Sequence, residues 1–200
     1  GSEGLKTLAR LRKVTGARIA DTIAARPAVY EDARRCAAVL PAARKRLQKA
    51  LTRLAGLYPQ ARFPAVTVAV GRGRPVAVGS PVTGVQVGLE ALCASDVLNP
   101  DIEDRFVYVL VHEFAHVQQA PSLTEKETPT VLEASLIEGA AEFVAEQTAG
   151  KIAYAYLPSL AAGREREIET AFLADIDKTD LSAWLYNTAP GKPGDLGYWV

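Results

Sequence analysis

Apolar residues recur at helical spacing through the first quarter of the chain. Within residues 5–57, Ala, Leu and Arg dominate. One apolar face of this segment is formed by Leu47, Leu51 and Leu54. Pro27 and Pro41 interrupt the pattern, because proline breaks the hydrogen bonding of a helix interior. The pattern therefore predicts two or three helices here.

The pattern then changes to short, alternating, valine-rich runs, which are typical of strands. Three such runs occupy residues 63–70, 76–78 and 85–89. Turn residues separate them, namely those at 71–75 and Gly79, Pro81 and Gly84. These runs predict a small sheet of three to four strands.

Helical spacing returns in the second half of the chain. The first helix there is predicted to run from about Pro100 to about Gln119, because apolar residues recur along this whole stretch. Asn99 or Asp101 can cap it, since both side chains accept hydrogen bonds from the free N–H groups of a first turn.

A polar loop at residues 121–129 separates this helix from the next. Thr130 and Glu133 have the spacing of a capping box, which opens a helix, and Gly150 is typical of the residue that ends one. A further charged, amphipathic helix is predicted over residues 159–176.

These elements predict an α+β fold, with an N-terminal helical segment at residues 1–60 and an α+β domain at residues 61–200. The 200 residues are 48% hydrophobic and 23% charged, which is ordinary for a globular protein with a sizeable core. No apolar run reaches the roughly 18 residues that span a bilayer, so we expect no integral membrane segment.

The charge is unevenly distributed along the chain. Residues 1–62 contain 14 Lys/Arg and four Asp/Glu, a net charge of +10, and residues 63–200 carry −10. A basic helical segment packed beside an acidic domain explains this division, and binding of an anionic surface is the alternative. No aromatic residue accompanies the basic residues before Tyr30 and no nucleic-acid motif occurs, so we expect no nucleic-acid partner.

The two cysteines, Cys36 and Cys93, are far apart in the sequence, and no histidine lies near either. We expect buried thiols, with a disulfide as the alternative if the protein is exported. The Gly1-Ser2 start and the absence of Met favour a periplasmic or secreted protein whose signal peptide has been removed, with the cytoplasm as the alternative.

The chemistry is concentrated in the sequence HEFAH at residues 112–116, an HExxH motif within the predicted helix. Residues four apart share one helix face, so His112 and His116 can bind one metal ion. Glu113 can then act as general base on a water molecule that zinc acidifies. The alternative is a helix whose histidines, the only two in the chain, are structural.

A catalytic zinc site requires three protein ligands and one open position. Without a third histidine, the remaining ligand must be Asp, Glu or Cys, and Glu138 is the best candidate. The 21 residues between His116 and Glu138 suffice for a loop and the start of a second helix. The small residues at 139–141 let two helices approach closely.

Glu142 lies one turn beyond Glu138 on the same helix face. It can accept a hydrogen bond from the free ring nitrogen of His112 or His116, as carboxylates behind zinc-bound histidines do. Glu133 on this helix is better explained as a cap. A solvated acidic stripe is the alternative explanation for the glutamates of this helix.

HEFAH followed by EGAAEF at residues 138–143 resembles the gluzincin metallopeptidases, in which a second helix carries a zinc-binding Glu after HExxH. Over roughly residues 63–200, the chain is also similar to a family of bacterial Zn-dependent proteases first catalogued as a domain of unknown function. The matching segments are residues 70–73 and 87–90, HEFAHVQQ, Leu136–Gly139 and Gly197-Tyr198.

The resemblance implies a thermolysin-like core, in which a small mixed or antiparallel sheet with a peptide-binding edge strand packs on two zinc-ligand helices. Carried over to this chain, it assigns His112, His116 and Glu138 to zinc and makes Glu113 catalytic. The chain lacks the GAMEN-type exopeptidase signature of the aminopeptidases, so nothing in it favours that activity.

The chain also lacks a later histidine that could stabilise an oxyanion, so a tyrosine is the remaining side chain for that role. Tyr198 is the first candidate, because the Gly-Tyr near the C-terminus matches the family. Alternatives are Tyr186, Tyr154 and Tyr156. For each of them, packing in the core is an equally good explanation.

The sequence thus predicts a zinc-dependent metallopeptidase that acts on a peptide or protein substrate. The alternative is a non-catalytic, zinc-stabilised module that binds peptides. A fourth protein ligand would favour this alternative, and Cys93 is the plausible soft candidate. A third hypothesis assigns the function to the basic helices, as a binder of anionic surfaces.

Overall fold

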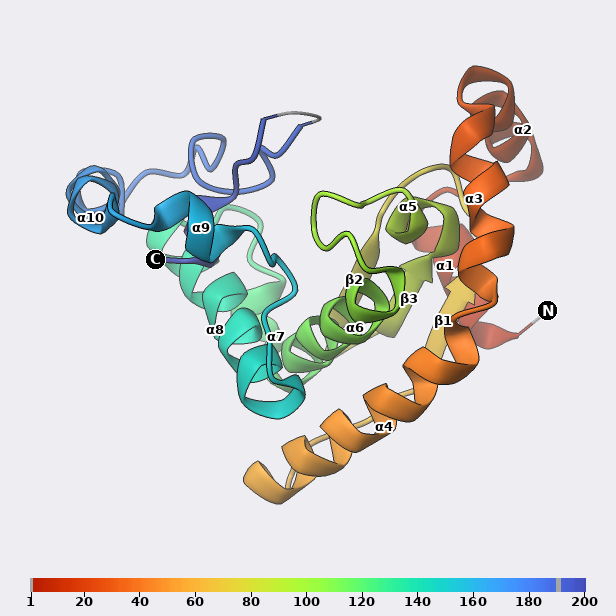
Figure 1. Cartoon of the computed structure of the whole chain (residues 1–200), viewed down its shortest axis with the longest axis horizontal. Coiled ribbons are helices and arrows are strands. Elements are labelled where there is room, and N and C mark those ends of the chain that lie inside the picture. Colours follow the sequence, from red (N-terminus) through yellow and green to blue (C-terminus); the bar gives the residue numbers. More distant parts are fainter. Residues whose placement is uncertain (1, 190–191) are drawn as a thin grey trace.

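The computed structural model describes residues 2–189 and 192–200. These residues form an α+β fold of ten α-helices, one 3₁₀ helix and one three-stranded sheet (Figure 1). The helices are α1 (Glu3–Leu11), α2 (Gly16–Ala25), α3 (Pro27–Ala37), α4 (Leu40–Leu57), α5 (Leu89–Cys93), α6 (Ile102–Gln118), α7 (Pro121–Thr124), α8 (Val131–Ala149), α9 (Leu157–Ala161), α10 (Glu165–Leu173) and η1 (Leu196–Tyr198). The strands are β1 (Val66–Ala69), β2 (Ala77–Ser80) and β3 (Gly84–Gly88). No helix within the described ranges combines the length and the apolar character needed to cross a membrane.

The N-terminal segment contains four helices, so the predicted two or three is wrong. Lys13 adopts a left-handed conformation just after α1, and the side chain of Thr15 caps α2. Pro27 and Pro41 occupy the first turns of α3 and α4, where the missing N–H costs nothing. The prolines therefore mark the starts of α3 and α4. The separation of α1 from α2 follows instead from the left-handed Lys13 and the Thr15 cap.

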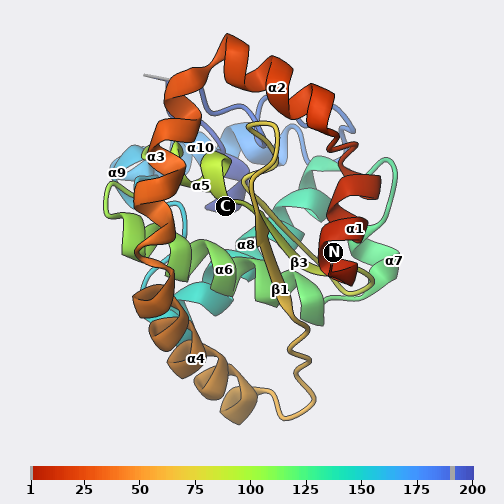
Figure 2. The same cartoon turned by 90° about the vertical axis from the view of Figure 1, so that its right-hand side faces the viewer.

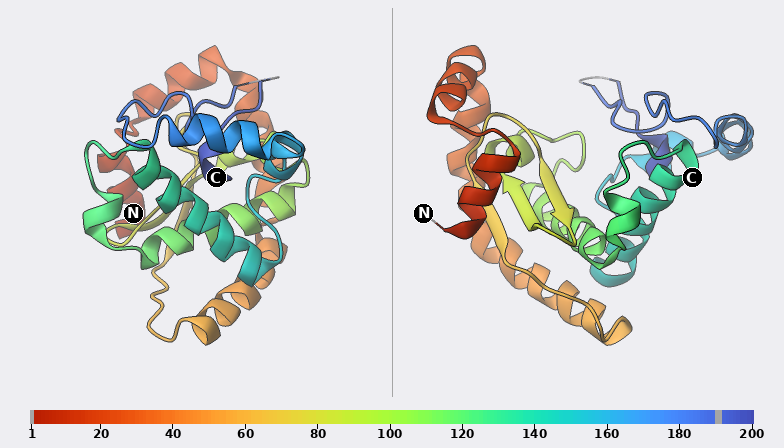
Figure 3. Two further views of the ribbon diagram at one scale, coloured as in Figure 1. Left: turned by 90° about the vertical axis from the view of Figure 1, so that its left-hand side faces the viewer. Right: turned by 180° about the vertical axis from the view of Figure 1, so that it is seen from behind.

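The sheet has the order β1-β3-β2, with β1 parallel and β2 antiparallel to β3. The predicted small sheet is confirmed at three strands, although Gly79 lies inside β2 and does not end it. Strand β2 pairs with β3 on one side, and its other side is an edge that faces α6 (Figure 3). Leu89, predicted to end a strand, opens α5.

Helix α6 forms the centre of the molecule. The side chain of Asp101 caps it by accepting a hydrogen bond from the N–H of Asp104 at 2.8 Å, which decides between the two predicted caps. Every residue at positions 105–117 is buried, because the sheet covers one side of α6 while α4 and α8 pack on others (Figures 1 and 3). A helix buried all round can hold polar side chains away from water.

Helix α8 packs against α6 and begins and ends as predicted. Thr130 and Glu133 form the full capping box, since each side chain accepts a hydrogen bond from the backbone N–H of the other. Gly150 ends the helix in a left-handed conformation, with φ of 95°. Both signals are local, which explains why the sequence pattern located this helix well.

The C-terminal segment departs from the prediction. The single helix expected at residues 159–176 is two helices, α9 and α10, because Gly163 adopts φ of 76° between them. The predicted polar loop contains the one-turn helix α7. After α10 the chain folds back, and η1 packs on α8. In Figures 1 and 2 this segment lies above α8, on the opposite side of the molecule from α1.

One hydrophobic core joins the two predicted parts of the chain. It includes Leu47 of α4, Val87 of β3 and Phe106 of α6, and the boundary predicted near residue 60 falls in the loop between α4 and β1. Cys36 on α3 and Cys93 on α5 form a disulfide with a Cα–Cα distance of 5.9 Å. The expectation of free thiols is therefore wrong, because folding brings two residues that are 57 positions apart into contact.

Strand β2 and helix α6 approach so closely that a side chain at Gly79 has no room. A Cβ there would lie 1.9 Å from the backbone oxygen of Glu113. We expect Gly79→Ala to lower the free energy of unfolding by about 1–3 kcal/mol, because the strand must move away from the helix. Urea denaturation measures this change.

Gly56→Ala is the matched control. Gly56 lies in α4, and a Cβ there would meet nothing within 4 Å. This substitution should raise stability by about 0.5–1 kcal/mol, because alanine loses less entropy than glycine in a helix. Equal effects of the two substitutions would contradict the close approach of β2 to α6.

Candidate metal centre

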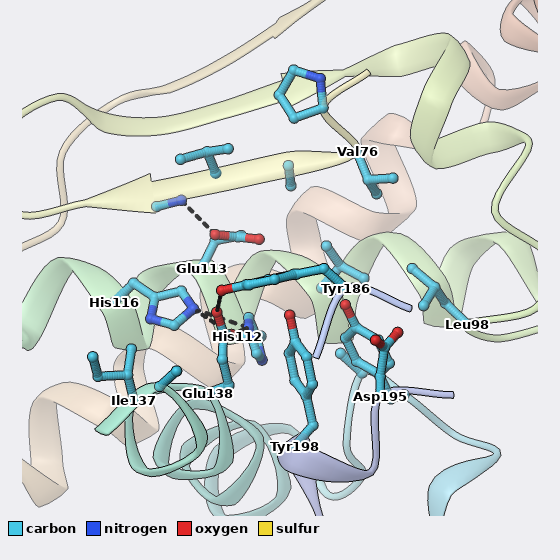
Figure 4. A pocket seen from close by; sticks show the side chains of 18 of the residues that line it. Val76, Leu98, His112, Glu113, His116, Ile137, Glu138, Tyr186, Asp195 and Tyr198 are labelled. Carbon is cyan, nitrogen blue, oxygen red and sulfur yellow. Dashed lines mark hydrogen bonds and ion pairs between the residues drawn. The ribbon is translucent and has the colours of Figure 1, made fainter. Parts of the chain in front are cut away.

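Three buried side chains from the two central helices converge on one point (Figure 4). His112 and His116 lie one turn apart on α6, and their Nε2 atoms are 3.0 Å apart. Oε2 of Glu138, on α8, lies 3.2 Å from each of these nitrogens. The residues predicted as ligands are thus brought together as a group that could hold a metal ion.

Glu142 lies behind His112. Its Oε1 is 2.7 Å from Nδ1 of His112, and its Oε2 accepts hydrogen bonds from the N–H groups of Ala153 at 2.7 Å and Tyr154 at 3.3 Å. The two backbone amides fix the carboxylate, so that its free oxygen faces the imidazole. A carboxylate oxygen accepts and does not donate, so this close approach favours the tautomer of His112 that carries its proton on Nδ1.

Gln119 lies behind His116 in the same way. Its Oε1 is 2.8 Å from Nδ1 of His116, and its Nε2 donates to the carbonyl oxygen of Ile137 at 2.7 Å. A carbonyl accepts only, so the NH₂ group must face Ile137 and the amide oxygen must face the imidazole. Nδ1 of His116 therefore also carries a proton.

With both Nδ1 atoms protonated, the Nε2 lone pairs of His112 and His116 point toward each other and toward the carboxylate of Glu138. Three electron-rich atoms that are 3.0–3.2 Å apart repel one another unless a metal ion or a shared proton lies between them. Tetrahedral zinc with bonds of about 2.0–2.1 Å places its ligand atoms about 3.3 Å apart. The donor set and its spacing therefore fit such an ion.

The direction of each pKa shift agrees with this crowding. Burial opposes the charged forms of all three groups, but the neighbouring carboxylates raise the pKa of His112 and of His116 above the usual histidine value. The two imidazoles in turn lower the pKa of Glu138 below its usual value, although burial alone would raise it. A proton and a metal ion thus compete for the same position, so metal affinity should decrease as the pH is lowered.

Glu113 is the acidic residue next to His112 on α6, and its side chain points toward β2 above the three ligands (Figure 4). Its Oε2 accepts a hydrogen bond from the N–H of Gly79. Burial raises the pKa of this carboxyl, and the nearby histidines oppose that shift. Glu113 therefore lies beside the ligand cluster but is not one of the three converging groups.

Two tyrosines from the C-terminal segment reach the same place. The hydroxyl of Tyr186 donates to Oε1 of Glu138 at 2.8 Å. The residue as a whole is 67% exposed, and its backbone is left-handed, with φ of 57°. Tyr198 is buried, and its ring faces that of His112 with 5.9 Å between centroids. Its hydroxyl points into the cavity (Figure 4). Burial raises the pKa of both phenols, so both remain hydrogen-bond donors at neutral pH.

The other two candidate tyrosines have different surroundings. Tyr154 is partly buried and stacks on Tyr198, with 4.3 Å between the ring centroids. The hydroxyl of Tyr156 shares a hydrogen bond of 2.8 Å with Thr188 and donates to the carbonyl of Gly194. These contacts explain both residues as packing and loop-holding groups.

A cavity of about 700 Å³ opens over the cluster. The residues that line it include the two histidines, Glu113, Glu138, the edge strand at 76–79 and both tyrosines. Its remaining walls are mostly apolar, with Val97, Leu98 and Leu181 among them. A buried donor set at the base of an apolar, open cavity is the arrangement of a ligand-binding or catalytic site.

Two further residues, Gly79 and Gln119, belong to this site and are not predicted from the sequence pattern. A glycine inside a valine-rich strand indicates close approach of another backbone. The sequence pattern alone places Gly79 in a turn, whereas it lies within β2. Gln119 is three residues beyond His116 and shortly before a proline, so it lies where a side chain can turn back toward the end of a helix.

Comparison with known proteins adds no relative: no family model, no curated protein and no solved structure matches the chain. The resemblance to gluzincins in the motifs therefore stays a prediction.

The cluster predicts that the protein takes up about one zinc ion per chain and that His116→Ala loses it. Because the ion relieves the repulsion between buried lone pairs, zinc at a thousandfold excess over its Kd should stabilise the wild type by about 4 kcal/mol. Elemental analysis and thermal unfolding measure both effects. Glu146→Ala, an exposed carboxylate on α8, is the control and should behave as wild type.

Absence of zinc from the wild type, even after reconstitution, would show that HEFAH is a structural helix. Equal loss in His116→Ala and Glu146→Ala would show that zinc binds adventitiously to surface carboxylates.

Proposed function

We propose that the protein is a zinc-dependent metallopeptidase, with His112, His116 and Glu138 as metal ligands and Glu113 as general base. The observation that carries the proposal is the convergence of three buried metal-ligand groups beside a separate carboxyl group, that of Glu113. A purely structural zinc site has no use for that carboxyl group, whereas water-dependent hydrolysis requires one. A thermolysin-like arrangement of the sheet and the two ligand helices is part of the proposal.

The edge of β2 supplies a surface for an extended peptide. The carbonyl of Val76 accepts from the N–H of Gly88, and Val78 pairs with Gln86. Peptide groups alternate in direction along an antiparallel pair, so those of Ala77 and Gly79 face away from β3. A substrate strand can hydrogen-bond to this edge, which would place its scissile carbonyl between Glu113 and the metal ligands.

Zinc held by three protein ligands acts as a Lewis acid that acidifies water and polarises a carbonyl. The chain supplies the proton transfers and the orientation. Glu113, held by the N–H of Gly79, takes a proton from the attacking water and returns it to the leaving amine. Its raised pKa suits a group that must both accept and release a proton.

The tyrosines have separate tasks in this proposal. The hydroxyl of Tyr186 donates to Oε1 of Glu138, so Oε2 would be the oxygen that holds the metal. Tyr198, whose hydroxyl points into the cavity (Figure 4), donates to the oxyanion as the tetrahedral intermediate forms.

The non-catalytic alternative uses the same ligands to stabilise a peptide-binding module. Cys93, the candidate for a fourth zinc ligand, forms a disulfide with Cys36 and therefore has no free thiol to bind a metal. That disulfide also supports our proposal of an oxidising location, the periplasm or the extracellular space. Glu113 is the residue that separates the two functions, because binding alone does not need it.

Glu113→Gln should keep about one zinc per chain and lower peptide turnover by about 10²–10⁴-fold, because the amide cannot take a proton. Turnover is measured on a fluorogenic peptide library and zinc by elemental analysis. Glu146→Gln, on the exposed side of α8, should keep both. Full activity of Glu113→Gln would remove Glu113 as the base. A zinc-loaded wild type that binds peptides without cutting any would establish the alternative.

Tyr198→Phe and Tyr186→Phe should affect different quantities. Loss of the oxyanion donor in Tyr198→Phe should lower kcat by about 10²–10³-fold with zinc affinity unchanged. Tyr186→Phe frees Oε1 of Glu138, so it should lower zinc affinity and affect kcat less. Steady-state kinetics at saturating zinc and a competitive zinc titration measure the two. A kcat loss confined to Tyr186→Phe would reverse the assignment.

A further inference from the structure

Helix α6 ends immediately beyond its second histidine, and this ending directs the next side chain back toward the metal centre. The helix ends at Gln118, and Gln119 has extended backbone angles, φ of −71° and ψ of 157°. The N–H of Gln119 still bonds to the carbonyl of His116 at 3.2 Å. In a continued helix this side chain would project around the helix surface, whereas here it lies against His116.

The amide of Gln119 contacts both helices of the metal centre. Its oxygen accepts from Nδ1 of His116 at 2.8 Å, and its NH₂ group donates to the carbonyl of Ile137 at 2.7 Å. Ile137 directly precedes Glu138 on α8. Gln119 thus joins one metal ligand to the backbone beside another.

We propose that Gln119 is a positioning residue of the metal centre: it fixes the proton of His116 on Nδ1 and the distance between His116 and Glu138. The inference rests on the metal centre proposed above and requires no particular substrate. Because Ile137 holds the NH₂ group, the amide cannot flip, and the Nε2 lone pair of His116 stays directed at the metal position.

The acceptors behind the two histidines differ in charge, and the difference has a consequence. Glu142 presents a carboxylate to His112, whereas Gln119 presents a neutral amide to His116. Glu113, Glu138 and Glu142 already place three carboxyl groups within the buried site. A fourth anion at position 119 would strengthen zinc binding but weaken the pull of zinc on the electrons of water and substrate, so a neutral acceptor orients His116 without that loss.

The neighbouring residue provides a matched control. The Nε2 of Gln118 donates to the carbonyls of Arg62 and Phe114, and its Oε1 accepts from the N–H of Arg62 at 2.7 Å. Gln118 therefore ties the end of α6 to the loop before β1 and touches no metal ligand. A general weakening of this helix end should follow from replacing Gln118, whereas a specific effect on the metal should follow from replacing Gln119.

The experiment compares Gln119→Met, Gln119→Glu and Gln118→Met by zinc affinity, measured in competition with a chromophoric chelator, and by the visible spectrum of the Co²⁺ form. Methionine has the length of glutamine but neither bonds His116 nor donates to Ile137. Gln119→Met should lose 10–100-fold in zinc affinity, the usual effect of removing the partner behind a zinc-bound histidine, and should change the Co²⁺ spectrum. Gln118→Met should match wild type in both.

Gln119→Glu keeps an acceptor for His116 but loses the donor to Ile137, so it should recover most of the zinc affinity that Gln119→Met loses. In ¹⁵N NMR of the zinc form, the Nδ1–H signal of His116 should persist in Gln119→Glu and be lost, or exchange rapidly, in Gln119→Met. These readouts report on the histidine itself and do not depend on turnover.

Wild-type affinity and an unchanged Co²⁺ spectrum in Gln119→Met would overturn the inference, as would the same affinity loss in Gln118→Met. Failure of Gln119→Glu to recover affinity would show that Gln119 is a helix bridge and does not set the proton of His116. Failure of the proposed peptidase function has a different signature, because the zinc and NMR effects would all be present while no peptide is cut. A wild type without zinc affinity would overturn both.

Discussion

The structure depends on one electrostatic constraint, which is that three electron-rich atoms of buried side chains converge at the base of a cavity. Isolated polar groups in such a place cost several kcal/mol, and like lone pairs cost more. Burial of α6 along its length, the close contact of α6 with α8, and the carboxylate of Glu142 and the amide of Gln119 behind the two histidines all hold this arrangement. The fold therefore presents a cation site that two helices share, and neither helix could form it alone.

Within this site, three buried carboxyl groups acquire different properties from their neighbours. Two imidazoles lower the pKa of Glu138 and keep it available as a ligand. Two backbone amides of the turn after α8 hold Glu142, so that one of its oxygens is free to orient His112. Glu113 receives one backbone N–H, and burial raises its pKa. Environment thus gives three residues of one chemical type different properties, and in the proposed function these suit a ligand, an orienting group and a proton acceptor.

How much of this could be predicted follows the range of each interaction. The spacing of His112 and His116 and the capping box at Thr130 act within one or two helix turns, so the sequence predicted their geometry. Glu138 and Glu142 required only the assumption that two helices pack. The disulfide, the contact of Gly79 with Glu113 and the contact of Gln119 with Ile137 join segments that are far apart in the chain, so local patterns do not identify the partners. The choice among tyrosines likewise depended on the path of the C-terminal segment, where a left-handed Tyr186 reaches Glu138.

The edge of the sheet and the general base are linked through a single peptide group. Gly79 gives its N–H to Glu113, and the same residue lies on the strand edge where a substrate would pair. A strand bound at this edge can use the peptide groups of Ala77 and the carbonyl of Gly79, but it cannot take the N–H of Gly79 without releasing Glu113. The absence of a side chain at Gly79 lets β2 lie against the backbone of α6, which is what brings that N–H within reach. In the proposed function, the same short approach would therefore orient Glu113 before a substrate arrives and limit where along β2 a scissile bond could lie.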